Sequence, residues 1–167
     1  MIQRRQRRST YRLPGHDYSD SSYAYFVTLN AKIRAVEATS LVDPQQPFTS
    51  FPPLGDQAIA SLDFYRLRGR WLVFAYCLMP DHLHLLVSPQ NGANLSAVLG
   101  NYESYLTHVA WGWGVIGRLW QRSFYDHILR SAEAAPDVVE YILDNPVKAG
   151  LVGRWEEWPL CGTPDPL

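Results

Sequence analysis

The sequence lacks any apolar run long enough to cross a lipid bilayer. Its longest apolar stretch, residues 71–80, is far shorter than the roughly 20 residues that a membrane-spanning helix needs. The arginine-rich start leads into no apolar signal core. We therefore predict a cytoplasmic protein without membrane association.

Cysteine is scarce, with only two residues in the chain. Cys77 falls in a predicted buried strand and Cys161 in the predicted C-terminal tail, so the pair has neither a metal-binding spacing nor the pattern of a disulfide framework. We expect two free thiols in a reducing compartment. A glycine-rich phosphate-binding loop is also absent from the sequence, which argues against a nucleotide cofactor.

The composition is that of an ordinary globular protein of 167 residues, with 47% hydrophobic and 19% charged residues. This length corresponds to one domain with one core. We expect a basic N-terminal arm over residues 1–22, a folded domain over residues 23–152 and a tail over residues 153–167.

The positive charge is unevenly distributed, although the net charge is only −1. The first twelve residues contain five arginines and no acid: Arg4, Arg5, Arg7, Arg8 and Arg12. This segregation fits a basic arm that follows a phosphate backbone, and it equally fits a solvated terminus without a partner.

The pattern of apolar residues and turn signals predicts the order β-α-β-β-α-β-α. The expected strands are 23–30, 71–79, 83–88 and 123–130, and the expected helices are 55–70, 94–111 and 134–145. Four prolines between residues 41 and 54 predict an exposed loop there. The tight link between the second and third strands makes them antiparallel. The predicted fold is α+β and ferredoxin-like (RRM-like), an antiparallel sheet with helices on one face.

Two histidines, His82 and His84, lie in the run Met79-Pro-Asp-His82-Leu-His84 at the start of a predicted strand. Side chains alternate faces along a strand, so both imidazoles project to the same side and can converge on one metal ion. The alternative is that the pair merely satisfies backbone groups.

A second candidate group lies on the last predicted helix, where Tyr141 and Asn145 are four residues apart and share a face. Together with the histidines they suggest a metal-assisted tyrosine nucleophile. The alternative is that Tyr141 packs on the sheet as part of the apolar helix face. Tyr105 and Tyr125 are competing nucleophiles that we expect to be structural.

Three sequence blocks together resemble a known family. They are the histidine run, the segment Trp120-Gln-Arg-Ser-Phe-Tyr-Asp-His127-Ile-Leu-Arg130, and the segment Tyr141-Ile-Leu-Asp-Asn145-Pro-Val-Lys-Ala-Gly-Leu-Val152. The chain resembles the IS200-like single-tyrosine transposases with a histidine-hydrophobe-histidine (HUH) motif. It is most similar to the REP-associated tyrosine transposases. The resemblance extends from about residue 7 to residue 159.

The resemblance implies a site, a cofactor and a partner. Tyr141 matches the catalytic nucleophile, and His82 and His84 match the metal-binding pair. Asn145 stands where IS200-like enzymes carry a glutamine ligand. The cofactor is then Mg²⁺ or Mn²⁺, and the substrate is single-stranded or hairpin DNA. IS200-like enzymes act as dimers with sites shared between subunits, whereas REP-associated relatives act as monomers, and both assemblies remain open.

Other residues have two interpretations each. Asp81 either orients His82 or forms a turn, and His127 either assists at the site or occupies a cross-strand surface position. Arg122 is assigned to DNA binding. With Arg118 and the tryptophans Trp111, Trp113 and Trp120, it forms either a base-stacking, phosphate-holding patch or part of the core.

The sequence therefore predicts a metal-dependent single-strand DNA endonuclease and strand transferase that forms a 5′-phosphotyrosine at hairpin or palindromic DNA. A catalytically silent, domesticated hairpin-binding protein is the first alternative. An unrelated metal-dependent hydrolase is the second.

Overall fold

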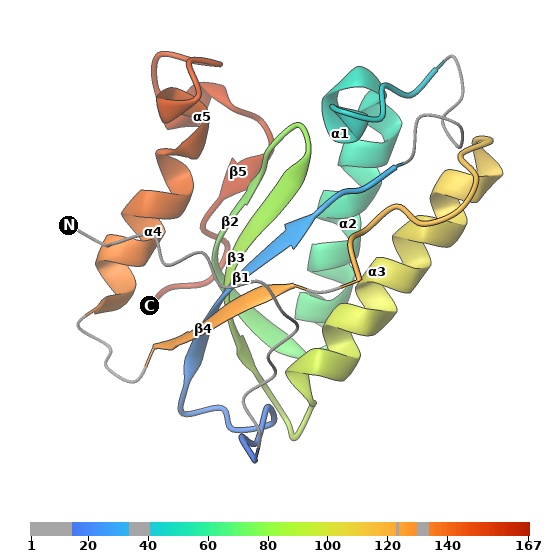
Figure 1. The fold of residues 1–167 in the computed structure, drawn as a ribbon. Helices are drawn as coiled ribbons and strands as arrows, with labels where there is room; N and C mark the ends of the chain where they lie inside the picture. The colour runs from blue at the N-terminus through green and yellow to red at the C-terminus, as the bar shows by residue number, and fades with distance from the viewer. Residues whose placement is uncertain (1–14, 34–40, 123, 130–133) are drawn as a thin grey trace.

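The computed structural model describes residues 15–33, 41–122, 124–129 and 134–167 (Figure 1). The five arginines of the N-terminal arm lie outside these residues. The elements in chain order are β1 (Ala24–Asn30), α1 (Pro47–Ser50), α2 (Pro52–Leu67), β2 (Trp71–Leu78), β3 (His82–Pro89), α3 (Leu95–Gly112), β4 (Tyr125–Leu129), α4 (Ala135–Leu143), α5 (Asn145–Lys148), a 3₁₀ helix (Trp155–Glu157) and β5 (Cys161–Gly162).

The strands form one antiparallel sheet in the order β4-β1-β3-β2-β5. β2 and β3 form the predicted hairpin, and β3 inserts between β1 and β2. The first four strands therefore have the order of a ferredoxin-like sheet, which confirms the predicted α+β fold. β4 lies at one edge of the sheet.

Helices cover both faces of this sheet, and not one face as the sequence suggested. α2 and α3 pack on the face that carries Leu83, Leu85 and Val87 of β3. α4 packs on the opposite face, where Leu86 of β3 contacts Ile142. Figure 1 shows α4 on one side of the sheet and the α2–α3 pair on the other. Hydrophobic periodicity identifies a helix's apolar stripe, but it does not specify which sheet face the stripe covers.

The proline-rich segment is more ordered than the predicted loop. Three of its four prolines, Pro47, Pro52 and Pro53, stand at the first positions of α1 and α2, where a missing N–H is tolerated because no intrahelical partner exists for it. Phe48 of α1 is fully buried in the core. The segment therefore packs against the domain instead of looping away from it.

The C-terminal segment also joins the domain. β5 extends the sheet beside β2, and Cys161 lies opposite Cys77 and forms a disulfide with it. The prediction of two free thiols is therefore wrong. Asp165 accepts hydrogen bonds from the Val73 amide at 2.8 Å and from Arg66 at 2.8 Å, which secures the last residues. A two-residue strand has no periodicity, so this pairing could not be predicted from the pattern of apolar residues.

Within the described residues, no helix is long and apolar enough to cross a membrane.

Candidate functional site

The two histidines project from the start of β3 onto the face that α4 covers. Leu83 between them is fully buried in the opposite core, so the strand alternation holds. The Nε2 atoms of His82 and His84 lie 3.1 Å apart. This is the convergence that the sequence predicted.

The Nδ1 atom of each ring, on the side away from the other histidine, contacts a side-chain oxygen. Asp81 Oδ1 lies 2.7 Å from His82 Nδ1, and Thr28 Oγ1 lies 2.9 Å from His84 Nδ1. Asp81 fulfils both of its interpretations, because it orients His82 and also lies in the β2–β3 turn, where its carbonyl accepts the Ala31 amide. Thr28 was not identified from the sequence. It reaches His84 because β1 and β3 pair these two residues directly.

Burial determines the charge state of His84, which is only 7% exposed. Burial, the larger cause, and the neighbouring His82 together lower the pKa of His84 to about 3, although a hydrogen bond with Asn145 opposes the shift. His84 is therefore a neutral imidazole near neutral pH, which is the form that ligates metal ions.

Tyr141 lies beside this pair within the same chain. Its ring centroid is 5.9 Å from that of His84 and 5.8 Å from that of Phe26. The side chain is 43% exposed, whereas the next residue, Ile142, is fully buried. Tyr141 thus stands at the solvent edge of the helix face and does not occupy the core. Lys148 Nζ lies 5.3 Å from the centroid of its ring.

Asn145 begins α5, one turn after Tyr141. Its Nδ2 donates to the Tyr141 carbonyl at 2.7 Å. Because the nitrogen of the amide is used there, Oδ1 is the atom left for the contact with His84. The sequence predicted that the helix ends near residue 145. In the structure α4 ends at Leu143, and after one residue the short helix α5 runs from Asn145 to Lys148. Lys148 is paired with Asp144 at 3.3 Å.

The donor set at this site fits a divalent ion. Two neutral imidazoles cannot place both Nε2 lone pairs 3.1 Å apart without a proton or a cation between them. Two nitrogens that each bind one ion at about 2.1 Å lie about 3 Å apart when the angle is near 90°. Among the residues that the structure describes, no group of three His, Cys, Asp or Glu side chains gathers. The side chain of Asn145 contacts His84 and adds an amide oxygen to the potential donors.

The other candidate residues, His127, Tyr125 and Tyr105, lie outside the histidine site. His127 on β4 pairs with Phe26, so the two side chains share the site face, and Phe26 separates His127 from Tyr141 and His84. Tyr125 pairs with Thr28 and is exposed at the edge of the sheet. Tyr105 on α3 is also partly exposed. Its hydroxyl donates to Gln57 of α2, on the sheet face opposite the histidine site.

The tryptophans separate into core and surface residues. Trp120 is 5% exposed and packs against Phe48, and Trp113 packs against Phe51. Trp111 is exposed and bonds to the Gly117 carbonyl at 2.6 Å. Trp120 is therefore a core residue, and Trp113 is partly buried against the core. Arg118 and Arg122, in contrast, are exposed.

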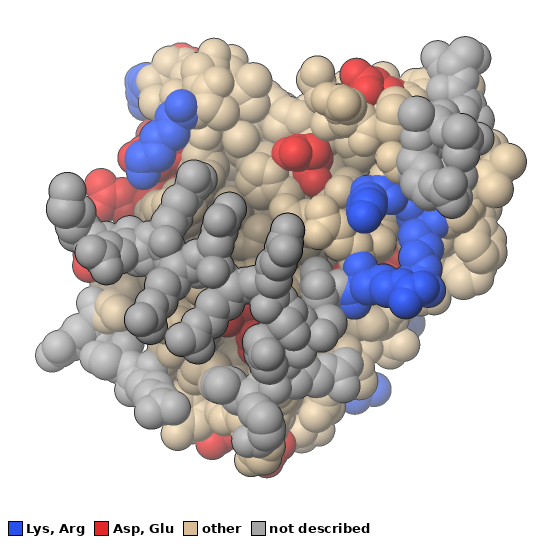
Figure 2. Space-filling view, viewed as in Figure 1, with Lys and Arg blue, Asp and Glu red and all other residues tan. Residues whose placement is uncertain are grey.

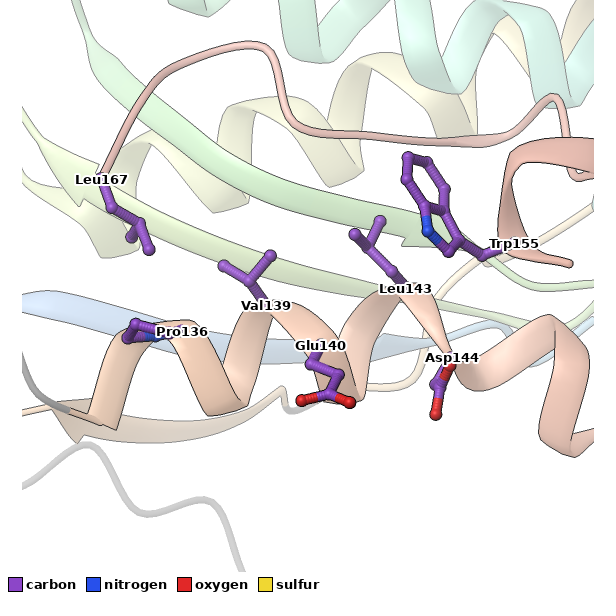
Figure 3. Close-up of a pocket in the computed structure, with 7 residues that line it drawn as sticks. All are labelled: Pro136, Val139, Glu140, Leu143, Asp144, Trp155 and Leu167. Carbon is purple, nitrogen blue, oxygen red and sulfur yellow. The ribbon is translucent and has the colours of Figure 1, made fainter.

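A pocket of 310 Å³ lies on another flank of α4 (Figure 3). In Figure 3, Val139 and Leu143 project to the same side of α4, on which Trp155 and Leu167 also lie, while the carboxylates of Glu140 and Asp144 lie on the other side of the helix. Val139 and Leu143 are each two residues from Tyr141, so at 3.6 residues per turn the apolar lining of the pocket lies on the side of the helix away from Tyr141. The pocket is therefore separate from the histidine site.

Comparison with known proteins supports the resemblance seen in the sequence. No family model matches the chain. It is 30% identical over 97 residues to a putative REP-associated tyrosine transposase of Haemophilus influenzae, covering 51% of this chain and 54% of the relative. It is 28% identical over 87 residues to the REP-associated tyrosine transposase of Escherichia coli, covering 52% and 50%. The aligned region thus spans about half the length of these two curated relatives.

A solved structure shares the fold. The structure of a REP-associated tyrosine transposase bound to a REP hairpin matches with a TM-score of 0.65 and 21% identity, covering 95% of this chain and 82% of that one. The predicted resemblance to the REP-associated tyrosine transposases is confirmed by these similarities in sequence and fold.

Proposed function

We propose that this relative of the REP-associated tyrosine transposases is a divalent-metal-dependent DNA endonuclease and strand transferase that acts on single-stranded hairpin or palindromic DNA. One observation carries the proposal. In a single chain, a solvent-accessible tyrosine, Tyr141, stands beside two converging imidazoles, those of His82 and His84.

His82, His84 and Asn145 would hold the metal ion, and Mg²⁺ and Mn²⁺ are the proposed ions. The mixed nitrogen and oxygen donors favour Mn²⁺ on ligand softness, while Mg²⁺ is the usual partner of phosphates. When bound, the ion would polarise the scissile phosphate and neutralise its non-bridging oxygens. Asp81 and Thr28 would keep both Nε2 atoms turned toward it.

Tyr141 is the proposed nucleophile. Its Oη attacks the phosphorus and releases the phenolic proton to solvent, while the bond from phosphorus to the 3′ oxygen breaks and that oxygen takes up a proton. The products are a 5′-phosphotyrosine and a free 3′-hydroxyl. Attack by a 3′-hydroxyl on this adduct rejoins DNA and frees the tyrosine. The phosphodiester energy is conserved in the adduct, so no nucleotide cofactor is required.

Lys148 is placed to help hold the phosphate. Its ammonium lies over the Tyr141 ring, so a phosphate bound to Tyr141 would meet a positive charge. Asp144 already orients this ammonium through an ion pair. A charge-assisted hydrogen bond of this kind is stronger than a neutral one.

The direct test is the formation of an SDS-resistant protein–DNA adduct. The purified protein is mixed with labelled single-stranded hairpin DNA from its own flanking genome, in Mn²⁺ or Mg²⁺. An adduct should form, and the substitution Tyr141→Phe should abolish it. Tyr105→Phe removes the hydroxyl of a comparably exposed tyrosine on α3, on the sheet face opposite the histidine site. It should leave the adduct unchanged. Hairpin binding without any adduct in either metal would instead identify a catalytically silent hairpin-binding protein.

A further inference from the structure

We propose that a surface at the β4 edge of the sheet, formed by Lys32, Arg118, Arg122 and Tyr125, binds the single-stranded DNA that flanks the cleaved bond. We call it the β4-edge surface. The inference rests on the proposed function, and it adds where the single-stranded DNA outside the hairpin lies on the protein. Tyr125 would stack on a base, and the three cations would contact phosphates.

Strand register connects Tyr125 to the histidine site. Tyr125 on β4 lies opposite Thr28 on β1, and Thr28 lies opposite His84 on β3. Residues that face each other across neighbouring strands have side chains on the same sheet face. Tyr125, Thr28 and His84 therefore form one row on the site face, with neighbouring strands roughly 5 Å apart.

Tyr125 is a large aromatic residue that is largely exposed. Its side chain is 55% exposed at the edge of the sheet. Aromatic side chains on an open sheet face are the usual platform on which proteins stack unpaired bases. Every base has such a face, so this contact suits a flanking strand of variable sequence.

The cations continue the same edge beyond Tyr125. The Lys32 amide donates to the Leu119 carbonyl at 2.7 Å, and the Gln121 amide donates to the Asn30 carbonyl at 2.9 Å. These bonds hold the segment before β4 along the end of β1. Figure 2 shows Lys and Arg side chains gathered over this part of the molecule.

Lys32 continues the alternation of β1. Val27, Leu29 and Ile33 face the α2–α3 core, so Lys32 falls on the face of Thr28. It lies about 7 Å along the chain from Asn30, which pairs with His82.

The positive charges of the surface are available to a ligand. Lys32, Arg118 and Arg122 are all exposed. Within the described part of the chain, no ion pair involves any of the three. A surface that combines an exposed ring with unpaired cations matches the two contacts by which single strands are held.

The test measures binding in the Tyr141→Phe background, so that no cleavage occurs. Two labelled DNAs are compared: the hairpin alone, and the same hairpin with single-stranded extensions on both sides. Tyr125→Ala should weaken binding of the extended DNA about tenfold and Tyr125→Phe should preserve it, because stacking needs the ring and not the hydroxyl. Tyr105→Ala is the matched control for loss of an exposed ring.

The cations are tested by the double substitution Arg118→Gln and Arg122→Gln. It should weaken binding of the extended DNA and lower the slope of log affinity against log salt by about one to two. The control is Arg68→Gln with Arg70→Gln, which removes two exposed charges beside the start of β2, at the other end of the sheet. Lys32→Gln should reduce the slope by a smaller amount.

Three results would overturn the assignment. They are equal losses in the test and control variants, equal losses on both DNAs, or equal binding of both DNAs by the Tyr141→Phe protein without further changes. These results leave the proposed function intact if the unaltered protein still forms the Tyr141 adduct. A protein that binds neither DNA would remove both proposals together.

Discussion

The ring of Tyr141 lies 5.9 Å from the ring of His84 in one and the same chain. If Tyr141 is the nucleophile and the histidines hold the metal, as proposed, these groups meet within one chain and need no second subunit to complete the site. α4 also contacts the same sheet whose β3 strand carries the histidines. The geometry therefore favours a site completed in cis, one of the two arrangements that the sequence left open.

A mixing experiment tests this arrangement. Tyr141→Phe keeps the histidines, and His84→Ala keeps the tyrosine. A site assembled in cis leaves every chain in the mixture without one essential group, so no adduct should form. Adduct formation is measured as SDS-resistant label, with each variant alone as the control. Recovery of the adduct on mixing would show that Tyr141 of one chain serves the histidines of another.

Thr28 should control metal binding without touching the metal. Its hydroxyl contacts His84 Nδ1 at 2.9 Å, so Thr28→Val removes the partner that fixes the ring while keeping the side chain's shape. Loss of such a partner weakens metal binding by about 10–100-fold. Calorimetric titration with Mn²⁺ measures the change. Thr107→Val, which removes a hydroxyl bonded within α3, should leave the affinity unaltered. An equal affinity in Thr28→Val would mean that His84 is oriented by packing alone.

Local sequence patterns predicted some residues of the candidate site and missed others. His82 and His84, and likewise Tyr141 and Asn145, could each be predicted to share a face from the short-range periodicity of a strand or a helix, and the family resemblance joined the two pairs into one candidate site. Thr28 and Phe26 were missed because their contribution depends on the register between β1 and β3. Register is set by long-range packing and leaves no local motif.

The same reasoning explains the errors in the fold. The four main strands and the hairpin could be predicted from alternation and turn signals. The pairing of β5 with β2 could not, because β5 has only two residues. The disulfide follows from that pairing, which brings together residues separated by 84 positions. Spacing alone therefore pointed wrongly to free cysteines.

The Cys77–Cys161 disulfide should stabilise the domain by securing the C-terminal segment. Closing a loop of this length lowers the entropy of the unfolded chain and contributes up to about 4 kcal/mol. Urea unfolding without reductant should show a lower free energy of unfolding for Cys161→Ser than for the unaltered protein. Reductant should destabilise the unaltered protein and have little effect on the variant. Alkylation under denaturing, non-reducing conditions should label neither cysteine; labelling of both would contradict the pairing.

Glu103 should make the stability of the domain depend on pH. It lies on α3, and burial raises the pKa of its carboxyl from its ordinary value of 4.5 to about 7. Between these two values the folded chain binds more protons at this position than the unfolded chain. The free energy of unfolding therefore falls as the pH rises from about 4.5 to about 7, and it does not recover above that pH.

Glu103→Gln tests this directly, because the amide is nearly the same shape and carries no charge. Urea unfolding at pH 8 should show the variant to be more stable than the unaltered protein. The gain should be on the order of 1 kcal/mol, since water still reaches part of the carboxylate and weakens the penalty. At pH 4.5 the two proteins should be about equal. Glu140→Gln, at an exposed position of α4, is the control and should retain the pH dependence of the unaltered protein.

If Glu103→Gln showed no gain at pH 8, the carboxylate would have to be solvated well enough to ionise without cost. The environment of this flank of α3 would then be more polar than its burial indicates.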